Sequence, residues 1–201
     1  MDNYCNCMKE IKLRVEVVNT ILQKRYTTAF QATNIECLCL QIRSILELIA
    51  LGSLVTDEDE YKKQSRRLAK NEWNAKVIIN EIEKINPKFY PEPVKQVIDP
   101  TTGRVKEVVS ITEGYLTRDE FPDVYNKCSE AIHSHPFIKG GFNYEQFEKD
   151  IPIWITKITV LLNNHLIQLL NEKEQLWVVM HTAPNGQVHT TLMEKVDNSD
   201  Q

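Results

Sequence analysis

The stretch NIECLCLQIRSILELIALGSLV, residues 34–55, decides the fold of this chain. Nearly every residue from Leu38 to Val55 is apolar or small, which is typical of a helix packed on several sides by other helices. Two charged residues, Arg43 and Glu47, lie within this run, one helical turn apart and on the same face. Because a charge in a protein core is costly unless it is paired, we expect both side chains to have partners there.

Five more segments are expected to be helical, from apolar spacing, capping patterns and charge placement. They cover residues 4–30, 56–70, 75–85, 117–135 and 144–170. Thr56 is the expected cap of the helix at residues 56–70. The charged run of this helix is interpreted as a solvated face, and the alternative is a basic patch at Lys62–Lys70 that binds a partner. Thr117 and Glu120 form a capping box. Pro152 predicts a kink or a restart of the last helix, with Asp150 as its cap.

Two segments change from helical to strand periodicity. β-Branched residues flank a turn at Pro100–Gly103, and Asn185-Gly186 between alternating residues suits a type I′ turn. We therefore predict a mainly α fold, a single domain over residues 1–201. It is a helical bundle of five to six helices that carries two small β-hairpins, one inserted at about 94–111 and one C-terminal at about 176–195.

Composition restricts location and partners. A net charge of -4 creates no global attraction to nucleic acid. The central apolar run is interrupted by polar residues and is a poor membrane span, and Met1–Glu10 lacks a secretory pattern, so we expect a cytoplasmic protein without membrane contact. The five cysteines, an odd number, predict reduced thiols.

The candidate site follows from the two charged residues of the central stretch. If the helix of residues 117–135 packs against it, Arg43 gains Glu47 and His133 as partners. One interpretation is a buried ion pair that sets the helix register. The other is a shallow groove in which Arg43 and His133 bind a phosphate or polarise a ribose hydroxyl. His135 and Lys139, which follow His133, are candidate binding residues.

A family resemblance rests on two segments, QIRSILELIALGSLV (41–55) and CSEAIHSHPF (128–137). They resemble uncharacterised bacterial members of the HEPN (higher eukaryote and prokaryote nucleotide-binding) superfamily. The resemblance implies a dimeric helical bundle from toxin-antitoxin, RNA-processing or phage-defence systems, in which active members are metal-independent ribonucleases.

The pattern of those active members is not carried by this chain. They have an arginine, then four to six residues, then a histidine on one helix. His133, His135, His165, His181 and His189 all lack an arginine at that distance. Only Arg43, Glu47 and His133 match the looser pattern, so the activity of the family does not carry over.

Metal and cofactor sites have little support. Cys5 and Cys7, and likewise Cys37 and Cys39, point to opposite sides of a helix and lack a zinc-binding spacer, so no metal is expected. No nucleotide-binding loop is present, and no cofactor is expected. Cys128 and His133 could form a nucleophile and base, but no oxyanion-hole pattern accompanies them.

Three functions stay open, and the sequence leaves it uncertain whether the protein is an enzyme. The leading hypothesis is a homodimeric HEPN-like binding or regulatory module, RNA- or nucleotide-related, in a bacterial defence or stress system. The alternative is a toxin-like, metal-independent ribonuclease that uses Arg43, Glu47 and His133. A third is a scaffold that binds a partner protein through its hairpins.

Overall fold

The computed structural model describes residues 2–55, 58–69, 75–133, 143–170, 174–182 and 185–194. Six helices and five strands lie in this part of the chain. The helices are α1 (Asp2–Leu22), α2 (Gln31–Gly52), α3 (Glu58–Ala69), α4 (Ala75–Ile85), α5 (Phe121–His133) and α6 (Tyr144–Asn163). The strands are β1 (Glu92–Ile98), β2 (Val105–Ser110), β3 (Asn164–Gln168), β4 (Glu174–Thr182) and β5 (Gln187–Glu194).

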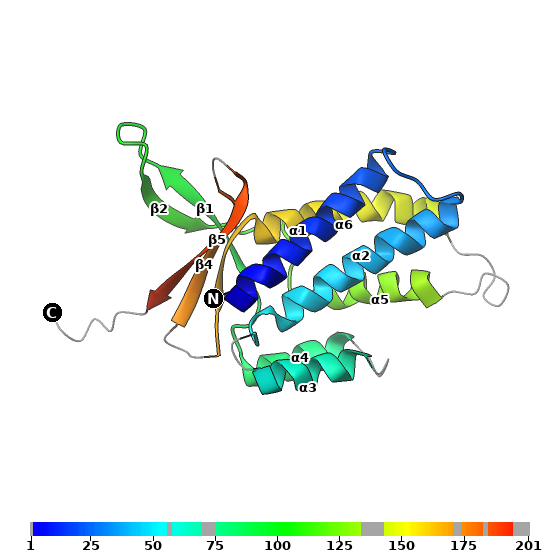
Figure 1. The fold of residues 1–201 in the computed structure, drawn as a ribbon, viewed down its shortest axis with the longest axis horizontal. Coiled ribbons are helices and arrows are strands. Elements are labelled where there is room, and N and C mark those ends of the chain that lie inside the picture. Colours follow the sequence, from blue (N-terminus) through cyan, green and yellow to red (C-terminus); the bar gives the residue numbers. More distant parts are fainter. Residues whose placement is uncertain are drawn as a thin grey trace.

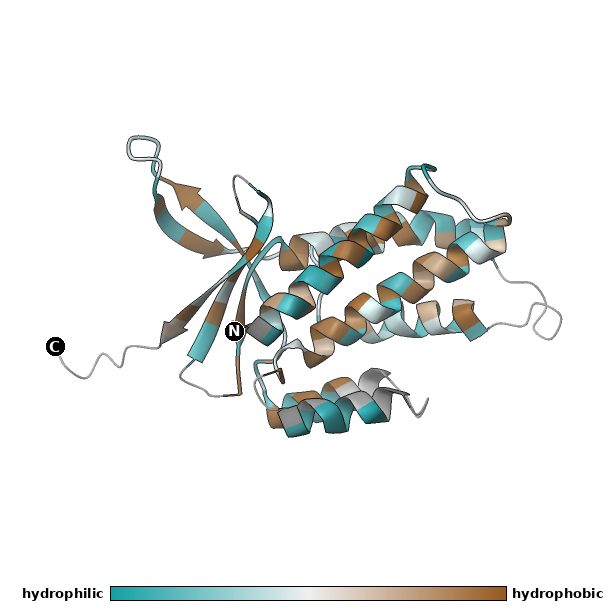
Figure 2. Cartoon of the chain, in the orientation of Figure 1, coloured by the Kyte–Doolittle hydropathy of each residue, from teal (hydrophilic) through white to brown (hydrophobic). Residues whose placement is uncertain are grey.

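Helix α2 forms the centre of the helical layer, as its sequence predicts (Figure 1). α1, α5 and α6 pack against it, and α3 and α4 lie beside its C-terminal end. Ile42, Ile45 and Leu46 are completely buried, and each contributes roughly 1.5–3 kcal/mol through removal from water. Figure 2 shows hydrophobic residues along α2, whereas α3 is mostly hydrophilic. Across the described residues, every helix is too short or too polar for a transmembrane span.

The prediction of a mainly α bundle with two separate small hairpins is wrong. The strands form one antiparallel sheet in the order β2-β1-β3-β4-β5, and the fold is α+β. Residues 164–168, expected to continue the last helix, form β3, which pairs with both β1 and β4. The expected hairpins are therefore the two flanks of a single sheet at one end of the helical layer (Figure 1).

The segment after α6 was mistaken for helix because its apolar residues fit both periods. In the structure His165, Ile167 and Leu169 are buried, which is the alternation of a strand. Asn164 adopts an extended backbone with φ −149° and ends α6. The predicted restart of this helix is also wrong, because α6 runs through Pro152 and is capped by the side chain of Asn143.

Helix α1 ends at Leu22 rather than near residue 30. Lys24 lies in the left-handed region with φ 57°. Its N–H donates to the Ile21 carbonyl at 2.9 Å, and the Arg25 N–H donates to the Thr20 carbonyl at 3.1 Å. This is the Schellman arrangement that ends many helices, here with lysine at the position usually held by glycine.

The turn between β4 and β5 differs from the predicted type I′ turn. Thr182 pairs with Gln187, so the connection is longer than the expected two residues, although Gly186 has the positive φ of 66°. The register is irregular between Val179 and Thr182, and His189 pairs with Val179.

A buried hydrogen-bonded pair joins α1 to the start of β3. The Tyr4 hydroxyl lies 2.8 Å from His165 Nε2, and His165 Nδ1 lies 2.8 Å from the Leu162 carbonyl. A carbonyl only accepts, so Nδ1 carries the proton and Nε2 accepts from Tyr4. Burial lowers the pKa of His165 to about 4, which keeps the ring neutral.

Candidate functional site

The site is formed by α2 and α5, and a capping box sets where α5 begins. The Thr117 N–H donates to Glu120 Oε2 at 3.0 Å, and the Glu120 N–H donates to Thr117 Oγ1 at 3.2 Å. This confirms the predicted capping box. Lys157 of α6 also donates to Glu120, and this bond is the main cause of the lowered pKa of that carboxyl.

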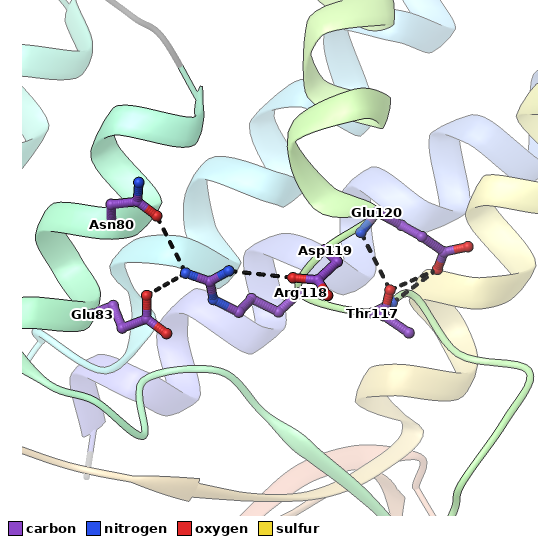
Figure 3. A network of polar contacts seen from close by, with 6 residues as sticks. All are labelled: Asn80, Glu83, Thr117, Arg118, Asp119 and Glu120. Carbon is purple, nitrogen blue, oxygen red and sulfur yellow. Dashed lines mark hydrogen bonds and ion pairs between the residues drawn. The ribbon is translucent and has the colours of Figure 1, made fainter.

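A second group of contacts ties the same turn to α4 (Figure 3). The guanidinium of Arg118 forms an ion pair with Glu83 and donates to Asn80 Oδ1 at 3.3 Å. It also pairs with the neighbouring Asp119 at 3.3 Å. Helix α5 is thus held at its start by contacts to both α4 and α6, which positions the residues further along it.

Arg43 and Glu47 form the predicted pair on α2. Arg43 Nε donates to Glu47 Oε1 at 3.1 Å. The same oxygen accepts from the hydroxyl of Tyr125, on α5, at 2.9 Å. The guanidinium carbon of Arg43 lies 5.0 Å from the centre of the Tyr125 ring, in the geometry of a cation–π contact. Three side chains from two helices therefore hold one another in place.

His133 joins this group from the last turn of α5. Arg43 Nη1 lies 3.3 Å from His133 Nε2. Arginine only donates, so in this contact Nε2 accepts and the ring proton lies on Nδ1. The structure therefore brings together all three residues, Arg43, Glu47 and His133, that the sequence analysis placed in one site.

Exposure separates the two interpretations of this cluster. The Arg43 side chain is 15% exposed and that of Glu47 is 29% exposed, while His133 is exposed. A fully buried lock is thus not what these residues form. Among the described residues, cavities of about 420, 520 and 630 Å³ are lined by side chains other than those of this cluster. The cluster is a partly exposed surface site whose polar groups remain within reach of a ligand.

Tyr125 is the member of the site that sequence reasoning missed. Its spacing fits the apolar face of its helix, and its ring is buried. Burial, followed by the nearby Glu47 carboxylate, raises the pKa of Tyr125, so the hydroxyl stays protonated and donates to Glu47. A tyrosine on an apolar helical face near an expected buried charge is the signal that could have identified it.

The buried thiols of Cys39 and Cys128 are not suited to act as a nucleophile. Cys128 is completely buried, and burial followed by a hydrogen bond with Cys39 raises its pKa well above the usual value. A neutral thiol is a poor nucleophile, so Cys128 and His133 are not arranged as a reactive pair. His135, Lys139 and the expected cap Thr56 lie outside the described residues.

The fold and site together define an α+β protein with a surface cluster of arginine, histidine, glutamate and tyrosine. No protein-family model matches the chain, and comparison with curated proteins and with solved structures finds no match either.

Proposed function

We propose that the protein is a binding module that holds a phosphate-bearing ligand, RNA or a nucleotide, at Arg43 and His133. In this proposal it is HEPN-like and cytoplasmic, and it acts as a homodimer in a bacterial defence or stress system. The setting comes only from the resemblance of residues 41–55 and 128–137. The chemistry of the site is argued from the contacts below.

The observation that carries the proposal is the 3.3 Å approach of Arg43 to His133 across α2 and α5. Both groups can donate to a phosphate oxygen, the guanidinium through its N–H groups and the imidazole through Nδ1–H. Glu47 and Tyr125 hold the guanidinium from its other side, so little side-chain freedom is lost on binding. A preorganised arginine beside a histidine is suited to a single phosphate group.

The hydrogen bond that His133 accepts from Arg43 favours a binding role over catalysis. A general base needs a free lone pair, and here the Nε2 lone pair accepts from Arg43. The ribonuclease alternative nevertheless has one observation in its favour, because a base and a cation that stabilises a pentacoordinate phosphorus would have to lie this close. In that alternative His133 is the base, and Glu47 orients Arg43.

The binding proposal is tested with a fluorescein-labelled single-stranded RNA and a hairpin RNA, by fluorescence anisotropy in the presence of a chelator. We expect Arg43→Gln to weaken binding by at least about tenfold, the loss of one charge-assisted contact. Arg14→Gln is the matched control, since Arg14 also pairs with a glutamate one turn away on a helix, Glu10, at 2.7 Å, and has no histidine partner in the part of the chain that the structure describes. Equal affinities of the two variants would contradict the proposal.

The same samples distinguish binding from cleavage. Intact RNA after incubation, read on a denaturing gel, supports the binding module. Cleavage that His133→Ala abolishes and Arg14→Gln leaves unchanged would instead support the ribonuclease.

A further inference from the structure

A second polar group lies far from the α2–α5 site, in a cavity of about 420 Å³ between α1, the end of α6 and β4. Five apolar residues line it, Ile11, Val15, Ile158, Leu162 and Met180, and the other nine lining residues are polar, among them Lys12, Glu16, Arg25 and His181. A cavity of this size that offers both apolar surface and polar groups can hold a small molecule.

Lys12 is the unusual member of this lining. Its half-buried ammonium donates to the carbonyl of Gly186 and lies 3.4 Å from that of Met180. Neither carbonyl carries a formal charge, and within the described residues Lys12 forms no ion pair. An ammonium has three donors, so these two contacts leave one donor for another partner. Lys12 is therefore a fixed positive charge at a cavity wall, without a carboxylate to neutralise it.

Two further titratable side chains, His181 and Glu16, line the same cavity as Lys12. Partial burial, followed by the charge of Lys12, lowers the pKa of His181, which favours a neutral ring that can donate or accept. Glu16 lies one helical turn beyond Lys12 and lines the same cavity. It would repel a dianion such as a phosphate monoester more strongly than a monoanion, so a singly charged head group fits best.

A second cavity adjoins this one. A neighbouring cavity of about 630 Å³ shares Thr159, Asn163 and His181 with it and extends to β1. Strand β3 pairs with β1 only at Glu92 and Pro93, so β1 and β4 diverge beyond that point, as Figure 1 shows. Val94, Val160 and Val179 add apolar surface there. The two cavities therefore adjoin at Thr159, Asn163 and His181, and an apolar body that extends past the first would reach the apolar surface of the second.

We propose that this cavity binds a small amphipathic monocarboxylate. The carboxylate accepts from Lys12 Nζ, with His181 and Asn163 at hydrogen-bonding positions around it. The apolar body lies over Val15, Ile158 and Leu162. The site shares no residue with the α2–α5 cluster and does not depend on the function proposed for that cluster.

The test uses octanoate as the probe, with octanol and octylamine as ligands of the same chain length without the negative charge. Isothermal titration calorimetry gives the affinities, and amide chemical shifts locate the site. We expect saturable binding of octanoate with shifts in residues 11–16, 158–163 and 180–181. Octanol and octylamine are expected to bind at least about tenfold more weakly, because both lack the anion.

Variants assign the effect to Lys12. Lys12→Met removes the charge and should weaken octanoate binding by at least about tenfold, whereas Lys12→Arg should retain most of it. Lys9→Met, an exposed lysine of the same helix that does not line the cavity, is the control. Thr159→Trp fills the junction of the two cavities from an exposed position and should abolish binding.

The proposal is overturned by three results. These are no saturable binding of octanoate to the wild type, equal binding of octanoate and octanol, and unchanged binding in Lys12→Met. If Lys12→Met does not fold, the ratio of octanoate to octanol affinity and the loss of octanoate binding in Thr159→Trp decide the question.

Discussion

Two polar clusters each contain a tyrosine and a histidine, and the clusters differ in their access to water. Tyr4 and His165 are completely buried, neutral, and bonded to each other at 2.8 Å. Tyr125 and His133 lie in a charged cluster with Arg43 and Glu47, and His133 is exposed. Desolvation explains the difference. The buried pair stabilises the junction of α1 and β3, whereas the exposed cluster keeps its charge and remains available to a ligand.

The largest expected effect is an acid sensitivity that comes from the buried cluster. The pKa of His165 is lowered to about 4, below its value of about 6.5 in the unfolded chain. The unfolded state therefore binds the proton more readily, and stability is fully present above pH 6.5. It falls as the pH drops, by about 3 kcal/mol at pH 4.

Urea unfolding at pH 7.5 and pH 4 measures this loss. Other groups titrate in the same range, so His165→Gln is compared with the wild type to isolate the contribution of His165. His165→Gln should lose about 3 kcal/mol less on acidification. The same acid sensitivity in both proteins would show that the buried imidazole does not cause the loss.

The next effect concerns the charged cluster. Arg43→Ala leaves Glu47 beside the buried ring of Tyr125 without its cation, which should cost about 2–3 kcal/mol in urea unfolding. This is less than for a fully buried pair, because solvent reaches part of the carboxylate. Arg14→Ala, which breaks the more exposed pair with Glu10, should cost about 1 kcal/mol or less. Equal costs would show that the Arg43 cluster is an ordinary surface pair.

The smallest losses of stability are expected when the hydroxyl groups of Tyr4 and Tyr125 are removed one at a time. Tyr4→Phe removes the donor to a fully buried imidazole nitrogen and should cost about 1–3 kcal/mol. Tyr125→Phe should cost about 0.5–1 kcal/mol, since Glu47 keeps Arg43 and contact with water. Thermal unfolding at pH 7.5 ranks the two. A reversed order would mean that burial does not govern what these hydroxyl groups contribute.

Local features were predictable where one element alone determines them. The central position of α2 followed from its apolar run, and the Thr117–Glu120 capping box from its spacing. The meeting of Arg43 and Glu47 with His133 was predicted only on the condition that the helix of residues 117–135 packs against the central helix, because a charge amid apolar residues must find partners. Tyr125 was missed because a tyrosine on an apolar face resembles any other core residue until its hydroxyl has a neighbour.

The sheet was not predictable in the same way. The sequence of residues 164–168 fits a helix as well as a strand. These residues form a strand because they pair with β1 on one side and β4 on the other. The early end of α1 likewise depends on Lys24 adopting the left-handed conformation. At β3 the local preference is weak and pairing with distant strands determines the result, whereas α1 ends through local hydrogen bonds around a lysine in a conformation that lysine rarely adopts.

The sequence alone determined the helical core, the helix cap and the charged residues that need partners, because burial and capping act over one or two turns. Only the tertiary structure decided that the two hairpins join into one sheet. It also decided that His165 is buried while His133 is exposed, and that Lys12 lies at a cavity wall and forms no ion pair with any of the described residues. The physical reason is that strand pairing and desolvation depend on residues far apart in the chain, whose positions no local pattern records.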